Sequence, residues 1–100
     1  MQMKNKQINA AIQVLPTVKD KHPYSVVDSA IAIINSSGLK YRVCPFETVV
    51  EGPYEKVIEL LEKVQDACYK DGAESLMVYV KIQSKASGNV TIEDKMEKYD

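Results

Sequence analysis

The side chains best suited to chemistry are two cysteines, one histidine and a pair of glutamates. Cys44 and Cys68 have no ligand-type neighbour at metal spacing, so we expect two reduced, buried thiols. His22 lies in a polar loop and is the only histidine, which excludes a histidine-based metal cluster but leaves a base paired with a carboxylate. Glu47 and Glu51 would lie about 13 Å apart along a strand, too far for a glycosidase pair. The sequence therefore predicts no catalytic residues and no metal site.

Several motif-based functions are also absent from the chain. The glycines are scattered at positions 38, 52, 72 and 88, so no phosphate-binding loop is present. The segment VKDKHPYSVVD has neither the arginine and glycines of an acylphosphatase loop nor the two cysteines of a metallochaperone. The strand ETVVE lacks the aromatic residues on which an RNA-recognition motif stacks bases.

The composition limits the classes of binding partner and the cellular compartment that we expect for this protein. The chain has 13 basic and 14 acidic residues and a net charge of -1, which disfavours nucleic-acid binding. No apolar run approaches the length of a membrane span, and the polar start MQMKNKQ has no signal-peptide core. We therefore expect a cytoplasmic protein without a membrane partner.

Two helices are predicted from apolar residues at helical spacing. The first is expected to be capped by Ser25, with Asp28 completing a capping box, and to end at Gly38. Its apolar stripe is Val27, Ala30, Ile31 and Ile34. The second should begin at Gly52-Pro53 and end at Asp71-Gly72, with the stripe Val57, Leu60, Leu61, Val64, Ala67 and Cys68.

Strands are predicted at 7–15, 39–43, 47–51 and 76–83, with Pro16 ending the first of them. A short extended segment and a helical turn capped by Thr91 are expected within residues 90–99. The order β-α-β-β-α-β predicts one α+β domain over residues 1–100 with a ferredoxin-like fold. In this fold two helices cover one face of a four-stranded antiparallel sheet.

The face without helices is expected to be apolar, because it carries Ala11, Leu15, Val49, Met77 and Tyr79. Burying about 500 Å² of this face would contribute roughly 12 kcal/mol before ordering costs. We therefore predict self-association through the sheet as a homodimer or homotetramer.

Three segments carry a resemblance to a known family: Ser37-Gly38-Leu39-Lys40-Tyr41 with Pro45 and Thr48-Val49-Val50-Glu51-Gly52, the strand end Ile12-Gln13-Val14-Leu15-Pro16, and Gly88-Asn89-Val90-Thr91-Ile92-Glu93-Asp94-Lys95. They are similar to the thiamine-binding, YkoF-like family of short ferredoxin-like proteins, from about Ile8 to Tyr99. The resemblance implies a non-catalytic protein of vitamin salvage or transport. It would bind thiamine or its hydroxymethylpyrimidine half, need no cofactor, and assemble as dimers or tetramers.

The resemblance also implies the ligand-binding residues. Thr48 and Glu51 are carried over from the family's Thr-x-x-Glu-Gly stretch as polar contacts, and an aminopyrimidine offers an amine that a carboxylate can accept. Tyr41 and Phe46 are candidate walls for the ring. Gln13 and Ser37 are the remaining polar candidates.

One geometric question stays open at this stage. Thr48 and Glu51 fall on opposite faces of an ideal strand, so a shared pocket needs either a bulge near Gly52 or a neighbouring subunit, which we favour. Two other functions also remain: an oligomeric regulatory module that senses another small metabolite, and a weak hydrolase that pairs His22 with a carboxylate.

Overall fold

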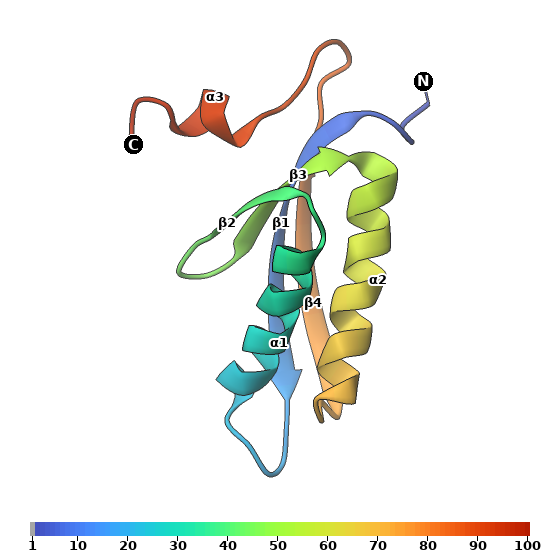
Figure 1. Cartoon of the computed structure of the whole chain (residues 1–100), viewed down its shortest axis with the longest axis vertical. Coiled ribbons are helices and arrows are strands. Elements are labelled where there is room, and N and C mark those ends of the chain that lie inside the picture. Colours follow the sequence, from blue (N-terminus) through green and yellow to red (C-terminus); the bar gives the residue numbers. More distant parts are fainter. Residues whose placement is uncertain (1) are drawn as a thin grey trace.

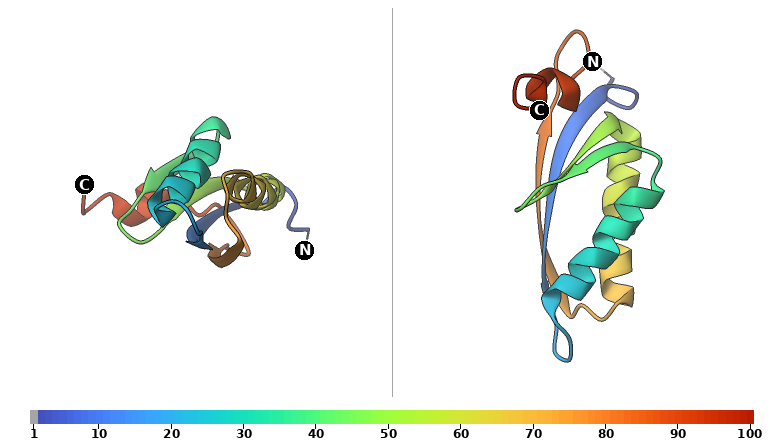
Figure 2. Two further views of the ribbon diagram at one scale, coloured as in Figure 1. Left: turned by 90° about the horizontal axis from the view of Figure 1, so that it is seen from below. Right: turned by 60° about the vertical axis from the view of Figure 1, so that its left-hand side comes forward.

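The computed structural model describes residues 2–100 and has a four-stranded antiparallel sheet in the order β2-β3-β1-β4 (Figure 1). Two long helices pack on one face of this sheet, and a short third helix follows the last strand (Figure 2). The elements are β1 Gln7–Thr17, α1 Pro23–Ser36, β2 Lys40–Val43, β3 Thr48–Pro53, α2 Tyr54–Lys70, β4 Ser75–Gln83 and α3 Ile92–Met96. This is the predicted ferredoxin-like α+β fold.

The core lies between the sheet and the two long helices. Period-two alternation on β1 places every second side chain inside, and none of these is more than 9% exposed: Ile8, Ala10, Ile12 and Val14. The buried stripe of α2 is Val57, Leu60, Val64 and Cys68. On α1 the buried residues are Val26, Ala30 and Ile34, so Val26 takes the place predicted for the half-buried Val27. Among residues 2–100, no helix has the length and apolar character to cross a bilayer.

Helix α1 begins earlier than the sequence predicted. His22 is the N-cap, and its Nδ1 accepts a hydrogen bond from the backbone N–H of Tyr24 at 3.2 Å. Pro23 occupies the start of the helix, where its fixed φ suits a helical first turn and its missing N–H costs nothing. Ser25 therefore lies inside the first turn, and the predicted Ser25–Asp28 capping box is wrong.

Strand β1 also continues further than predicted. Pro16 does not end it, because Pro16 pairs with Leu76 and the strand runs to Thr17. The pairing of β1 with β3 stops at Ile12, so the last part of β1 has a neighbouring strand on one side only. A proline fits there because no partner on the open side needs its N–H.

The opposite face of the sheet is partly apolar and partly covered. Leu15, Met77 and Tyr79 are 45%, 58% and 51% exposed at the uncovered end. At the other end the C-terminal segment leaves β4 and crosses toward β2, burying Val90 and Ile92 (Figure 1). The helical turn capped by Thr91 is confirmed, since its hydroxyl accepts from the N–H of Asp94 at 3.0 Å.

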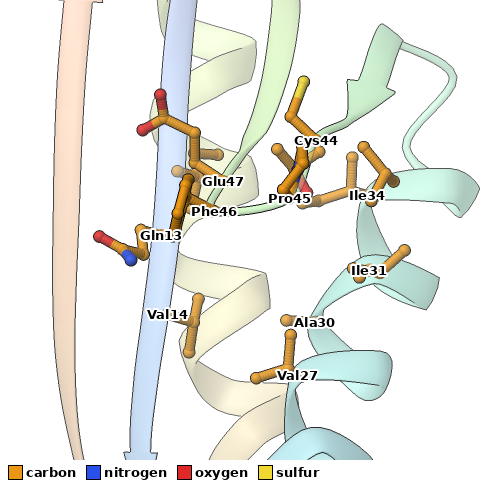
Figure 3. A pocket seen from close by; sticks show the side chains of 13 residues that line it. Gln13, Val14, Val27, Ala30, Ile31, Ile34, Cys44, Pro45, Phe46 and Glu47 are labelled. Atoms are coloured by element: carbon orange, nitrogen blue, oxygen red, sulfur yellow. The ribbon is translucent and has the colours of Figure 1, made fainter.

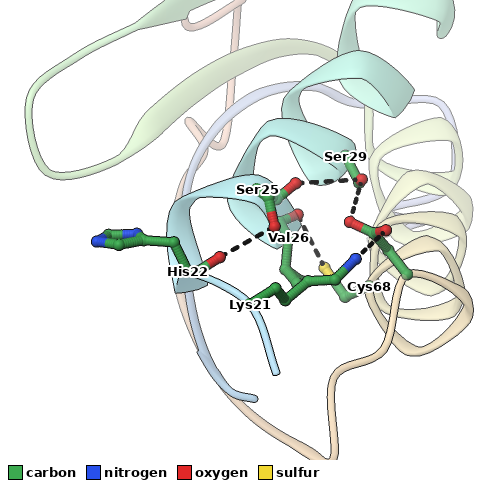
Figure 4. Close-up of polar contacts among 7 residues, drawn as sticks. Lys21, His22, Ser25, Val26, Ser29 and Cys68 are labelled. Carbon is green, nitrogen blue, oxygen red and sulfur yellow. Dashed lines mark hydrogen bonds and ion pairs between the residues drawn. The ribbon is translucent and has the colours of Figure 1, made fainter. Parts of the chain in front are cut away.

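A polar cluster joins the β1–α1 loop to the end of α2. Asp71 accepts hydrogen bonds from Lys21 Nζ and from the Ser29 hydroxyl, each at 2.8 Å. These two bonds lower the pKa of the Asp71 carboxyl, with that from Lys21 the larger cause. The His22 ring points away from this cluster (Figure 4), so the cluster stabilises the fold and contains no paired base.

The lowered pKa of Asp71 makes the stability of the protein fall in acid. The unfolded carboxyl, with its ordinary value of 3.8, takes up a proton before the folded one does. The stabilising contribution is therefore complete above about pH 5 and is lost as the pH falls through the lowered pKa of the folded carboxyl. We expect Asp71→Asn to lower the stability at pH 7 and to weaken the dependence of stability on pH in this range. Urea unfolding at several pH values measures both effects. Asp20→Asn removes the same charge from the loop and is the control. If the stability of both variants falls equally in acid, Asp71 is not the source of the pH dependence.

Candidate functional site

Thr48 and Glu51, the two polar residues expected to bind a ligand, lie on opposite faces of the sheet. The β1–β3 pairing is continuous along residues 7–12 of β1, so β3 has no bulge. Gly52 instead lies against Leu39, and a Cβ there would lie 2.9 Å from the Leu39 Cδ2 atom, so the leucine side chain would have to shift. A bulge therefore does not bring Thr48 and Glu51 into one pocket of a single chain.

Three of the expected residues line one cavity. Gln13, Phe46 and Thr48 border a space of about 160 Å³ between α1 and the β2–β3 turn, which we call the hairpin cavity (Figure 3). Its other walls are mainly apolar side chains of α1, such as Ala30 and Ile34. Phe46 is 83% exposed at the rim of this cavity, whereas Thr48 is buried.

Ser37 and Tyr41 are engaged locally and line neither of the cavities described here. The Ser37 hydroxyl donates to the carbonyl of Ile34 at 2.6 Å and accepts from the N–H of Leu39 at 3.1 Å, closing the end of α1. The Tyr41 hydroxyl donates to Asn35 Oδ1 at 2.6 Å. Both side chains thus hold the α1–β2 connection in place.

A second cavity lies on the face opposite the long helices, beneath the C-terminal segment. It measures about 280 Å³, and we call it the sheet-face cavity. The residues that line it come from three strands, the β2–β3 turn and α3: Asn9, Arg42, Cys44, Val49, Ile92, Lys95 and Met96. Cys44 borders both cavities and is only half-buried, so the prediction of two buried thiols is right for Cys68 and wrong for Cys44.

The buried side chain of Asn9 has only some of its hydrogen-bonding capacity satisfied. It is 3% exposed, and its Nδ2 donates to the carbonyls of Ile8 at 3.3 Å and Val90 at 3.2 Å. Two carbonyl partners fix the amide orientation, since a flipped amide would put its oxygen against them. Oδ1 of Asn9 is the buried side-chain atom left without a hydrogen bond within residues 2–100. Such an acceptor costs about 1–3 kcal/mol unless a further donor reaches it.

Glu51 lies directly opposite Asn9 in the β1–β3 register, on the same face of the sheet. One carboxylate oxygen, Oε1, accepts a short hydrogen bond of 2.6 Å from the backbone N–H of Ile92. This bond holds the C-terminal segment over the sheet and leaves the second oxygen available. Directly opposed side chains in an antiparallel pair are close neighbours, so two acceptors from adjacent strands meet beside the cavity.

Two cations border the same cavity. Arg42 donates to Asp100 Oδ2 at 2.9 Å, and this hydrogen bond raises the pKa of the guanidinium. Lys95 donates to the neutral amide oxygen of Gln83 at 2.8 Å. Burial lowers the pKa of Lys95, and the charge of Glu51 acts in the opposite direction.

This arrangement fits a flat ligand that bears N–H donors. Asn9 lines the cavity together with the apolar residues Val49, Ile92 and Met96, which supply walls for a ring. The Glu51 carboxylate is not among the lining residues, but it lies opposite Asn9 on the same face, so an amine held at Asn9 would have a second acceptor beside it. No group of three potential metal ligands occurs in the part of the chain described.

The sequence suggested Glu51 as a ligand contact but did not single out Asn9, which lies opposite it in the sheet. Asn9 lies between Ile8 and Ala10, so it falls on the face of the strand without helices. Polar residues are common on the exposed face of a strand, so this one gave no sign of a special role. The signal that could have found it is the pairing of two polar residues across neighbouring strands, which requires the register of β1 against β3.

The comparison with known families decides the classification. The sequence model described as thiamine-binding protein matches residues 10–100. The chain belongs to the thiamine-binding protein family. The resemblance seen in the sequence is thereby confirmed.

Relatives of this thiamine-binding family member agree in sequence and fold. A UPF0045 protein of Clostridium perfringens is 41% identical over 91 residues, 91% of this chain and 95% of that protein. A solved DUF77 domain of unknown function from Bacillus cereus has a TM-score of 0.92 and 35% identity, covering 100% of this chain and 96% of the other. A suspected thiamine biosynthesis/salvage protein from Thermotoga maritima has a TM-score of 0.86 and 34% identity, covering 94% and 99%.

Proposed function

We propose that this protein binds thiamine or its hydroxymethylpyrimidine half in the sheet-face cavity, as a step in thiamine salvage or transport. The observation that carries the proposal is the buried Oδ1 of Asn9, which lacks a donor and lies opposite Glu51. Membership of the thiamine-binding family and the described role of the Thermotoga maritima protein support the choice of ligand.

The aminopyrimidine ring matches the cavity in donors and in shape. Its exocyclic amine offers two N–H groups, one for Asn9 Oδ1 and one for the free oxygen of Glu51. The ring faces can pack against Val49 and Met96, whose sulfur favours contact with aromatic rings. Micromolar binding needs about 8 kcal/mol, which a buried ring and two charge-assisted or buried hydrogen bonds can supply on a preformed site.

We propose that binding is not followed by a reaction. His22, the residue considered for a hydrolase, caps α1 beyond the far end of β1 from the cavity. Its imidazole is therefore not placed to pair with Glu51. The two free thiols, Cys44 and Cys68, fit a reducing compartment such as the cytoplasm.

We also propose that the apolar end of the sheet joins two or four copies. Leu15 pairs with Met77 across β1 and β4, and Tyr79 lies beside Gln13, so these large side chains form one patch. Exposed patches of this kind usually mark an interface. The patch adjoins the sheet-face cavity through Ala11 and Val49, which a partner copy would cover as well.

A thermal-shift experiment tests the binding proposal. Thiamine and hydroxymethylpyrimidine at 100 times their dissociation constants should each stabilise the fold by about 2.7 kcal/mol. For a domain of this size the melting temperature should rise by on the order of 10 °C. The control ligand is the same pyrimidine without its amine, which should give little shift. The proposal is contradicted if neither thiamine nor hydroxymethylpyrimidine shifts the melting temperature, or if the control ligand shifts it equally.

A further inference from the structure

The face of the sheet around the cavity concentrates four basic side chains from three elements, β2, β4 and α3. Arg42 and Lys95 line the cavity, Lys40 lies opposite Glu51 on β2, and Lys81 extends from β4 on the same face. The whole chain has a net charge of -1, so this concentration is local.

Two of these cations have a carboxylate partner and two have none. Arg42 pairs with Asp100 at 2.9 Å and Lys81 with Glu47 at 3.2 Å. Lys40 and Lys95 make no ion pair within 4.0 Å among residues 2–100. Glu51 pairs with Lys40 in the β2–β3 register and its charge acts on Lys95, but its Oε1 already accepts from the N–H of Ile92.

Lys95 is the cation best placed to meet a ligand. Its ammonium has three donors, and the neutral oxygen of Gln83 takes one of them at 2.8 Å. Loss of water on the sheet lowers the pKa of Lys95, so the charged form would gain from an anion at this position.

We propose that the preferred ligand of the sheet-face cavity is an aminopyrimidine that carries a phosphate ester, with the amine at Asn9 and Glu51 and the phosphate at Lys95. This inference rests on the proposed function and specifies its ligand class. It applies equally to phosphorylated hydroxymethylpyrimidine and to a thiamine phosphate, which share the ring and the anion. Compared with these esters, unphosphorylated thiamine brings only its cationic thiazolium toward the basic side chains.

Isothermal titration at fixed ionic strength tests the proposal with four probes: hydroxymethylpyrimidine, its monophosphate, thiamine monophosphate and inorganic phosphate. The pyrimidine monophosphate should bind at least about 10-fold more tightly than the alcohol, equivalent to about 1.4 kcal/mol. In Lys95→Gln this difference in affinity between the ester and the alcohol should shrink below about 3-fold. Lys85→Gln, in the loop after β4, is the matched control and should keep the full difference.

The outcomes separate this inference from the proposed function. Equal affinity for the alcohol and its phosphate would overturn the inference and leave the function standing. Failure of every pyrimidine to bind would overturn both. Binding of inorganic phosphate as tight as that of the ester would also overturn the inference, because the ring would then contribute nothing. A gain in affinity with only one of the two phosphorylated ligands supports the inference and identifies which of the two esters the site prefers.

Discussion

Replacing Glu51 with glutamine is expected to weaken binding of the aminopyrimidine by about 10- to 100-fold, because a hydrogen bond to a charged acceptor is worth about 1.5–3 kcal/mol. The amide oxygen of the variant can still accept from the Ile92 N–H, so the C-terminal segment should stay in place. The other end of the amide becomes a donor and would face the donors of the ligand amine. Isothermal titration with hydroxymethylpyrimidine measures the effect, and urea unfolding should show little change in stability.

Glu93→Gln provides the matched control for this variant. Glu93 is exposed on α3 and loses the same charge close to the same cavity. The affinity of this variant should stay within about 2-fold of that of the unmodified protein, since solvent screening makes an exposed surface charge worth little. The assignment of Glu51 fails if both variants bind equally well, or if Glu51→Gln binds normally.

Introducing two glutamates on the apolar end of the sheet should dissociate the assembly. In the double variant Leu15→Glu and Met77→Glu, the new carboxylates lie directly opposite each other across β1 and β4. Burying such unpaired charges between copies costs several kcal/mol, so association should weaken by at least about 1000-fold, or about 4 kcal/mol. Sedimentation equilibrium should find dimers or tetramers of the unmodified chain and monomers of the variant.

Ile58→Glu is the control for assembly. Ile58 is a large apolar residue of α2 with 41% exposure, close to the 45% of Leu15, but it lies on the helical layer. This variant should assemble normally. A monomeric unmodified protein at high concentration, or dissociation caused by Ile58→Glu instead, would show that the uncovered sheet face is not the interface.

The fold was predictable because local patterns and the global arrangement agree. The alternation of Ile8 with Ala10 and Ile12, and the stripe from Val57 to Cys68, each allow one element and one buried face. Errors arose where a single residue shifts a boundary. Pro23 starts α1 before the serine that resembles a cap, and Pro16 is tolerated because β1 has no second neighbour there.

The candidate site was only half predictable. Glu51 belongs to a local motif, whereas Asn9 matters because Val90 and Ile92, some eighty positions later in the chain, lie over it and remove it from water. Periodicity places Asn9 on the face without helices but carries no information on what crosses that face. The placement of Thr48 and Glu51 on opposite faces of the sheet did follow from strand parity.

A crystal structure of the protein with hydroxymethylpyrimidine tests the central claim most directly. The account predicts the ring in the sheet-face cavity against Val49, with its amine within hydrogen-bond distance of both Asn9 Oδ1 and the Glu51 carboxylate. A ring bound in the hairpin cavity beside Phe46 and Thr48, with Asn9 Oδ1 still lacking a donor, would contradict it.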